Sequence, residues 1–308
     1  FCPTCAVSLV RRVRSTRKGP DGRRIKPVKF GDQITLDHVN MRQTGIGGFT
    51  HGLPLLSVAT NFKAGEPCRR LNAIESGAHI RYFIAQDPIS LIYADGYQGV
   101  KKAVEDLNIN FQASEPGNPQ SNSIAESNVE DYLKGARSTC HHAGLPSCFW
   151  TYAGPMHCIH SNNRKRNGKT PYVERFGQKW EGKEIPFRAG VFFMPPPTRH
   201  TPAKAAPPMI YGIIVGYTVG PGYRWGKAYK CLALDDFIGT NLSVDTSMKE
   251  FSDIWHSEYI TSRVWLPGGS VVFPLKQEYD RINFTLAGRS DLKAKPCAPQ
   301  VAIQRPIA

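Results

Sequence analysis

Between residues 33 and 160, short apolar runs alternate with longer segments of helical pattern, and this alternation restricts the chain to a mixed α/β fold. The apolar runs have the length of strands and are expected at residues 34–39, 53–59, 67–71, 90–94 and 109–112. Helices are expected at residues 74–85, 100–107, 118–140 and 147–160, the third with Asn118 as its N-cap and Pro119 in its first turn. The sequence therefore predicts a five-stranded mixed sheet flanked by helices.

Changes in composition divide the chain into five segments. Residues 1–30 are a basic linker behind a cysteine motif, and residues 31–165 are the α/β core. A basic and proline-rich connector follows at 166–208, because the prolines between 195 and 208 exclude a helix. Apolar and turn residues alternate from 209 to 240, which predicts a small antiparallel β module. Residues 241–308 form an extension whose structure the pattern does not decide.

The charge of the chain favours a polyanionic partner. Lys and Arg number 39 against 25 Asp and Glu, a net charge of +14, and a surplus of this size is typical of nucleic-acid binding. Residues 1–30 contain nine of the basic residues and one Asp, so Arg11, Arg12 and Arg14 are candidates to contact DNA phosphates. The alternative is a solvated arm without a ligand.

Other features of the sequence predict an intracellular protein. No apolar run reaches the ~18 residues of a membrane span, and no signal segment opens the chain. The eight cysteines are mostly scattered singly, as is typical of reduced thiols. Because the chain starts without Met and directly on a cysteine motif, we expect it to be part of a longer protein.

Three acids stand where a metal site would be expected. Asp37 lies in the first apolar run, Asp95 ends another, and Glu126 lies in the helix after Asn118. An acid among buried strand residues is unfavourable unless its charge is balanced, and carboxylates suit Mg²⁺ or Mn²⁺. Two such ions can support phosphoryl transfer. The alternative for each acid is a helix cap or a surface partner.

These segments resemble the DDE integrases of LTR retrotransposons, copia-type especially. Residues 31–37 (GDQITLD) and 91–96 (LIYADG) are similar to the segments with the first two catalytic Asp residues of the family. Residues 118–128 (NPQSNSIAESN) are similar to the helix with its catalytic Glu. Residues 145–150, 169–176 and 216–237 resemble later parts of such a Pol polyprotein, so the resemblance covers roughly residues 2–238.

The resemblance implies an RNase H-like core that trims DNA ends and transfers them to target DNA. Asp37, Asp95 and Glu126 would be catalytic and would bind two Mg²⁺ or Mn²⁺ ions. DNA contacts would come from residues at the helix or its entrance, namely Asn118, Gln120, Asn122 and Lys134. The family also implies homo-multimers and action in the nucleus at the time of integration.

The match has departures that leave alternatives open. The interval from Asp95 to Glu126 is shorter than is usual in the family, and Gly96, Ser123 and Ser127 replace its common Asn, Gly and Arg. A catalytically degenerate element copy, or a recruited nucleic-acid-binding relative, therefore remains an alternative to the active enzyme. An RNase H-like nuclease that acts on RNA–DNA hybrids is a third possibility, because it would use metal-binding acids in the same way.

Cys2 and Cys5 have the two-residue gap of a zinc half-site, which needs two further ligands. Family members have a His pair upstream of such cysteines, so Zn²⁺ is expected only with ligands that precede this sequence. His141, His142, His157 and His160, with Cys140 and Cys158, fit no zinc spacing, and we expect them to be surface and packing residues. The glycine-rich segment 45–48 is expected to be the turn between the first two strands.

Overall fold

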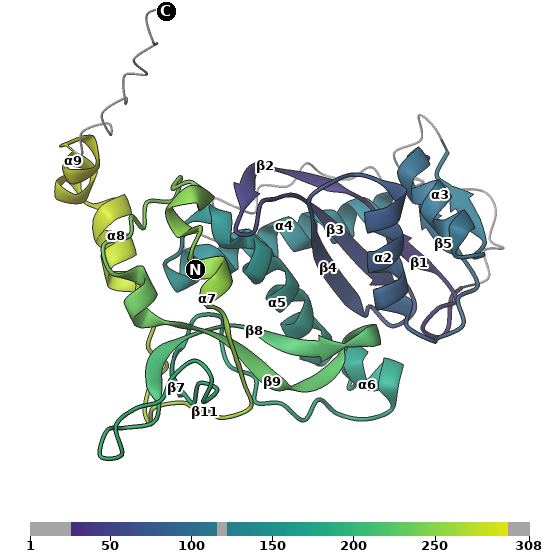
Figure 1. Cartoon of the computed structure of the whole chain (residues 1–308). Coiled ribbons are helices and arrows are strands. Elements are labelled where there is room, and N and C mark those ends of the chain that lie inside the picture. The colour runs from purple at the N-terminus through teal and green to yellow at the C-terminus, as the bar shows by residue number, and fades with distance from the viewer. Residues whose placement is uncertain (1–25, 116–121, 295–308) are drawn as a thin grey trace, which may run out of the picture.

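The structure, a computed structural model, describes residues 26–115 and 122–294 of the chain. They form two β-sheets with helices packed between and around them (Figure 1). The sheet of the N-terminal half has the strands β1 (Ile34–Leu36), β2 (Val39–Gly45), β3 (Phe49–Ser57), β4 (Lys63–Cys68), β5 (Ile92–Ala94) and β6 (Phe111–Ala113).

Strands β1 and β2 are two halves of one strand. Both pair antiparallel with the same edge of β3 in one register, in which Ile34 lies opposite Ser57 and Asn40 opposite His51. Strand β4 pairs with the other edge of β3, while β5 and β6 extend the sheet beyond β1 in parallel. The five positions β4, β3, β1/β2, β5 and β6 have the order and directions of the RNase H-like fold, so the predicted fold class is confirmed.

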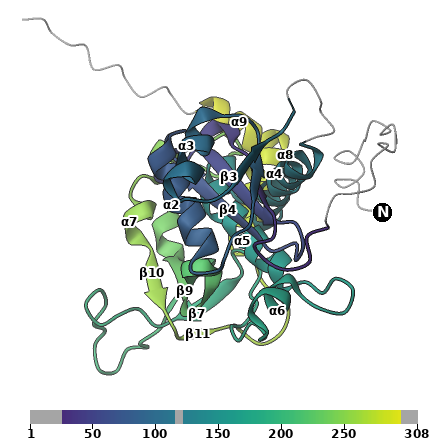
Figure 2. The same ribbon diagram turned by 90° about the vertical axis from the view of Figure 1, so that its right-hand side faces the viewer.

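Helices cover both faces of this sheet. Helix α2 (Ala73–Ile84) shares a core cluster with the strands through Ile80 and Phe83. On the opposite face lie α4 (Ser123–Ala143) and α5 (Trp150–Asn163), so β3 and β4 are enclosed between α2 and this pair (Figure 2). Helix α3 (Gln98–Asp106) connects β5 to β6 and packs beside α2.

The predicted start of the third helix is wrong. Helix α4 begins at Ser123 with Asn122 at its N-cap position, whereas the predicted cap, Asn118, lies outside the described residues. The end of α4 is fixed by Gly144, whose left-handed conformation (φ 74°) allows the chain to leave the helix.

The second sheet is antiparallel and has the order β10-β9-β8-β7-β11. Its central hairpin turns at residues 221–223, where Gly222 adopts a positive φ of 76°. Besides strands within the predicted β module at 209–240, the sheet contains strands that lie before and after this segment in the sequence. Its members are β7 (Gly190–Phe193), β8 (Ile210–Gly220), β9 (Arg224–Ala233), β10 (Tyr259–Thr261) and β11 (Val264–Trp265).

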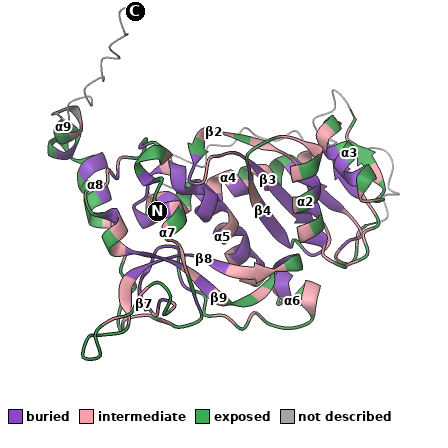
Figure 3. Cartoon of the chain, in the orientation of Figure 1, coloured by how far each residue is buried: buried purple, intermediate pink, exposed green. Residues whose placement is uncertain are grey.

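One continuous apolar core joins the second sheet to helices α4 and α5. Met156 and Ile159 of α5 belong to the same buried cluster as Ile213 and Val215 of β8. The buried positions accordingly concentrate where the helices face the two sheets (Figure 3).

Short helices complete the structure. They are η1 (Ser147–Phe149), α6 (Pro171–Phe176), η2 (Pro221–Tyr223), η3 (Leu234–Phe237), η4 (Met248–Phe251), α7 (Ile254–Ser257), α8 (Lys276–Phe284) and α9 (Leu286–Ala294). Within the described ranges, none of the helices combines the length and apolar character needed to cross a membrane.

Candidate active site

Asp37 and Asp95 lie side by side at one edge of the first sheet. Asp37 directly follows β1 and Asp95 directly follows β5, and the preceding residues, Leu36 and Ala94, are paired across these parallel strands. Both acids are half-buried. The crevice outside the carboxyl ends of parallel strands is a common place for ligand binding in α/β proteins.

The side chains of Asp37 and His38, between β1 and β2, point to opposite faces of the sheet. His38 points to α2, where its Nε2 lies 3.2 Å from the hydroxyl of Ser76. Asp37, one residue earlier, interacts electrostatically with Glu126 in the first turn of α4, on the other face. Alternation along a strand therefore directs Asp37 toward α4.

The charges of two of the acids act on the third. Burial, the negative charge of Asp95 and, to a smaller extent, that of Glu126 raise the pKa of Asp37 to about 6, while a hydrogen bond from the backbone of His38 opposes the shift. Sequence positions 37, 95 and 126 thus lie at the same end of the sheet. Glu126 itself is exposed, so this end is open to a ligand.

The three carboxylates do not converge on a single point. Across residues 26–115 and 122–294, the only set of three Cys, His, Asp or Glu ligand atoms within 4.8 Å of one another is Cys68, Glu75 and His79. The oxygens of Asp37, Asp95 and Glu126 are therefore more widely spaced. The donor set still fits a hard divalent cation, because three carboxylates around a half-buried position repel one another unless a cation neutralises them.

His38 and Tyr97 border the acids, and the sequence analysis did not single them out. Burial lowers the pKa of His38 to about 4, so its imidazole is neutral at physiological pH. The Tyr97 ring packs edge-on against His38 with 5.8 Å between centroids, and its hydroxyl donates to the carbonyl of Leu71 (2.8 Å). The backbone N–H of Tyr97 donates to Asp95 Oδ1 (3.3 Å), which orients that carboxylate.

Two predicted DNA-binding residues fall in the described part of α4. Asn122 stands at the N-cap position, but its side chain caps no backbone N–H, and its buried Oδ1 has no hydrogen-bond partner among the described residues. Lys134 lies along the helix and pairs with Glu130 (Nζ to Oε1, 2.6 Å).

The other predicted site residues lie outside the described residues. They are Asn118 and Gln120 before α4, Arg11, Arg12 and Arg14 in the basic linker, and Cys2 and Cys5 of the half zinc site.

The histidines and cysteines at 140–160 pack in the interior or against neighbouring side chains, as predicted. Cys140 and Cys158 are buried free thiols. His157 Nε2 lies 3.3 Å from Asp131 Oδ2, and His160 Nε2 lies 3.0 Å from the Tyr217 hydroxyl. Segment 45–48 is the turn between β2 and β3, which confirms that prediction.

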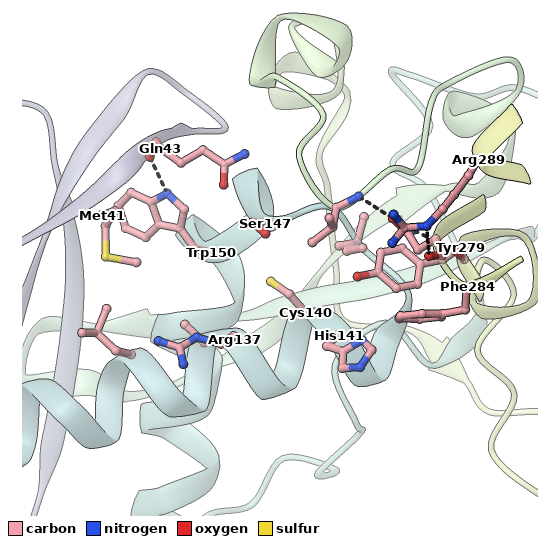
Figure 4. Close-up of a pocket in the computed structure, with 15 residues that line it drawn as sticks. Met41, Gln43, Arg137, Cys140, His141, Ser147, Trp150, Tyr279, Phe284 and Arg289 are labelled. Carbon is pink, nitrogen blue, oxygen red and sulfur yellow. Dashed lines mark hydrogen bonds between the residues drawn. The ribbon is translucent and has the colours of Figure 1, made fainter. Parts of the chain in front are cut away.

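A pocket of about 500 Å³ opens further along α4, between β2 and α8 (Figure 4). Its lining combines Met41, Trp150 and Phe284 with the cations Arg137 and Arg289. Trp150 is held by a hydrogen bond from its Nε1 to the carbonyl of Gln43 (3.2 Å). None of the three acids lines this pocket, so it is separate from the candidate active site.

Comparisons with known proteins find similarity to solved structures only. No protein-family model matches the chain, and no curated protein matches it. Among solved structures, the crystal structure of the catalytic core domain of BIV integrase is similar over 46% of this chain and 91% of that chain, with 13% identity and a TM-score of 0.35. The RNase H-like assignment therefore rests on the strand order and directions described above.

Proposed function

We propose that this chain is the integrase region of a copia-type retrotransposon Pol polyprotein, which processes the 3′ ends of element DNA and joins them to target DNA. One observation carries the proposal. Asp37 and Asp95 directly follow neighbouring parallel strands, and the charges of Asp95 and of Glu126 in α4 act closely enough on Asp37 to raise its pKa. These are the three acids that the integrase-like motifs single out.

Asp37, Asp95 and Glu126 would hold two Mg²⁺ or Mn²⁺ ions. When bound, such ions activate a hydroxyl nucleophile and stabilise the leaving oxygen of a phosphodiester. The chain itself positions the acids: the Tyr97 backbone orients Asp95, and the first turn of α4 presents Glu126. Neutral His38 adds no positive charge to compete for the carboxylates.

DNA is the proposed substrate. Asn122, whose side-chain oxygen makes no hydrogen bond within the described structure, lies one turn before Glu126 and is suited to contact a strand that reaches the acids. We assign phosphate contacts also to Asn118, Gln120, Lys134 and the arginines at 11, 12 and 14. To contact a phosphate, Lys134 must first break its ion pair with Glu130. Action as a homo-multimer in the nucleus is part of the same proposal.

A strand-transfer assay with oligonucleotide duplexes and Mg²⁺ or Mn²⁺ tests the enzyme. We expect product from the parent chain and a loss of at least roughly 100-fold in Asp95→Asn, the scale on which one electrostatic group in an active site acts. Asp106→Asn is the matched control, because Asp106 is an exposed acid on the neighbouring helix α3. Product that survives in Asp95→Asn would refute the proposed site.

The second candidate function is DNA binding without catalysis. The wide spacing of the three carboxylates and the replacements Gly96, Ser123 and Ser127 favour it. It predicts salt-sensitive DNA binding in both the parent and Asp95→Asn, with no product from either. An RNA–DNA hybrid as a further substrate tests the nuclease alternative, which predicts cleavage of the hybrid and no joining of DNA.

A further inference from the structure

Three potential metal ligands of different chemistry meet where β4 ends and α2 begins. Cys68 is the last residue of β4, and Glu75 and His79 lie four residues apart on α2, which places them on one face of the helix. The Cys68 Sγ, a Glu75 carboxylate oxygen and a His79 ring nitrogen all lie within 4.8 Å of one another. Helix α2 and strand β4 pack directly together (Figure 1).

Backbone hydrogen bonds hold the Glu75 carboxylate in place. Its two oxygens accept hydrogen bonds from the backbone N–H groups of Arg69 (2.7 Å) and Arg70 (2.8 Å). Asn72 caps helix α2 by accepting a hydrogen bond from the backbone N–H of Glu75 (2.8 Å). Cys68 is fully buried. Two of the three groups are therefore already fixed by the fold.

His79 is partly exposed, but its Nε2 is a buried ring nitrogen without a hydrogen-bond partner among the described residues. Its Nε2 is inaccessible to solvent and makes no hydrogen bond within the described structure. The nearest carboxylate oxygens are 4.0 Å from Nε2 (Glu75) and 3.8 Å from Nδ1 (Glu66), which is too far for hydrogen bonds. A buried ring nitrogen without a partner is destabilising by roughly 1–3 kcal/mol, so this position calls for a ligand.

We propose that Cys68 Sγ, the Glu75 carboxylate and His79 Nε2 bind a Zn²⁺-class metal ion. Thiolate, imidazole and carboxylate are the ligands that Zn²⁺ takes, at about 2.0–2.3 Å from the ion. Atoms bound to one tetrahedral ion lie about 3.5 Å apart, so modest side-chain movement from the observed spacing closes the site. The proposal is independent of the DNA chemistry above, because none of these residues belongs to the three acids.

Glu66 is placed to act as the hydrogen-bond partner of the histidine ligand. A zinc-bound histidine usually donates its other ring N–H to a carboxylate, which fixes the tautomer. Glu66 Oε2 faces His79 Nδ1, and its Oε1 already accepts a hydrogen bond from the Tyr223 hydroxyl. With Nε2 on the metal, a shift of the ring that shortens the 3.8 Å separation of Nδ1 and Glu66 Oε2 to a hydrogen bond would satisfy both ring nitrogens.

Three protein ligands leave a fourth tetrahedral position for water, as in zinc sites that are not closed by protein. His79, together with Glu66, also lines a cavity of about 570 Å³ between α2, α5 and the second sheet. The metal would also brace Ser76, which lies between the two α2 ligands and contacts His38.

Cobalt titration of the full chain tests the site. Because Cys2 and Cys5 could bind metal on their own, the parent for this experiment carries Cys2→Ser and Cys5→Ser. We expect one thiolate-bound Co²⁺ per chain, seen as a near-ultraviolet sulfur-to-cobalt charge-transfer band that Zn²⁺ displaces and that Co²⁺ bound to carboxylates alone does not give. In that background Cys68→Ser should abolish the band, and Cys158→Ser is the matched control, since Cys158 is another buried free thiol.

Two further variants keep the test decisive where Cys68→Ser fails to fold. His79→Gln should lower Co²⁺ affinity at least tenfold, and Glu66→Gln should lower it roughly 10–100-fold as a partner of the ligand. Circular dichroism establishes that each variant is folded. A parent without the charge-transfer band, or a band that survives in Cys68→Ser or keeps its affinity in His79→Gln, overturns the site.

Discussion

Asp37 and Asp95 extend from paired ends of two neighbouring parallel strands, and the negative charge of Asp95 adds to burial in raising the pKa of Asp37 to about 6. A fold rarely places two acids together at such a position without a cation or proton to share between them. Groups with perturbed pKa values in such crevices are candidate functional residues. This relationship is the physical basis of the proposed metal site.

The raised pKa of Asp37 predicts how stability varies with pH in metal-free protein. The folded state holds the Asp37 proton more tightly than the unfolded chain, because the pKa is about 6 against an ordinary 3.8. Its stabilising contribution is present below pH 4 and is lost as the pH rises through about 6. We expect Asp37→Asn to remove this decline, measured as the free energy of unfolding in urea between pH 4 and pH 7.

Asp32 is the control, because its pKa is shifted in the opposite direction from that of Asp37. Hydrogen bonds from the backbone N–H groups of Lys29 and Val28 lower the pKa of its carboxyl, so its contribution is present at neutral pH and lost as the pH falls. Asp32→Asn should therefore leave the decline between pH 4 and pH 6 in place. If Asp37→Asn also leaves it in place, Asp37 is not the group with the raised pKa.

The Tyr132 ring of α4 packs against glycines in three other elements, and their lack of side chains leaves room for it. The buried ring lies against Gly52 of β3, Gly65 of β4 and Gly154 of α5, and a Cβ at position 65 would lie inside van der Waals contact with the ring. We expect Gly65→Ala to destabilise the protein by about 1–3 kcal/mol through overpacking. Gly220→Ala, where a Cβ meets open space, should change stability by no more than about 0.5 kcal/mol in the same thermal or urea unfolding experiment.

The hydroxyl of Tyr132 leads to a separate prediction. It is buried and has no hydrogen-bond partner within the described structure. Removing a buried unsatisfied group relieves a desolvation penalty, so Tyr132→Phe should leave stability unchanged or raise it by up to about 1 kcal/mol. A loss of more than about 1 kcal/mol on urea unfolding would mean that the hydroxyl has a partner after all.

The basic segment predicts the salt dependence of DNA binding. Each phosphate contact contributes about 0.9 to the slope of log K against log salt concentration. If Arg11, Arg12 and Arg14 each contact a phosphate, replacing all three by Ala should reduce the slope by about 2.7, as measured by fluorescence anisotropy from low to moderate salt. An unchanged slope would identify the segment as a solvated arm.

The sequence predicted the order of elements better than their boundaries. Apolar periodicity placed the first strand at 34–39, whereas the structure has strand at Ile34–Leu36 and again from Val39, with Asp37 and His38 between the two. The predicted third strand at 67–71 lies at Lys63–Cys68, since pairing with β3 selects the register that no local pattern specifies.

The motif at residues 169–176 matched a family pattern, and its residues prove to be structural. Thr170 caps α6 by accepting from the backbone N–H of Val173 (3.1 Å). Arg175 is buried, pairs with Asp87 (2.8 Å) and lies 3.6 Å from the centroid of the Phe30 ring. The motif alone could not distinguish this anchoring from a role at the site, because the partners of Arg175 are about ninety positions away or more.

The candidate site was predictable in part. The acids at 37, 95 and 126 stood out in the sequence, whereas His38 and Tyr97 around them did not, because their roles come from packing between β1, α2 and the start of α3. The Cys68, Glu75 and His79 cluster also left no sequence signal. Its members have no standard zinc spacing and meet only through the packing of β4 on α2.

Binding of Mn²⁺, followed by electron paramagnetic resonance as the free ion disappears, tests the central claim most directly. Asp37, Asp95 and Glu126 are proposed to hold the ions together, so we expect Asp37→Asn, Asp95→Asn and Glu126→Gln each to lower Mn²⁺ affinity at least tenfold. Glu130→Gln, one turn further along α4, should bind like the parent. Equal Mn²⁺ affinity in the parent and all four variants would contradict the account.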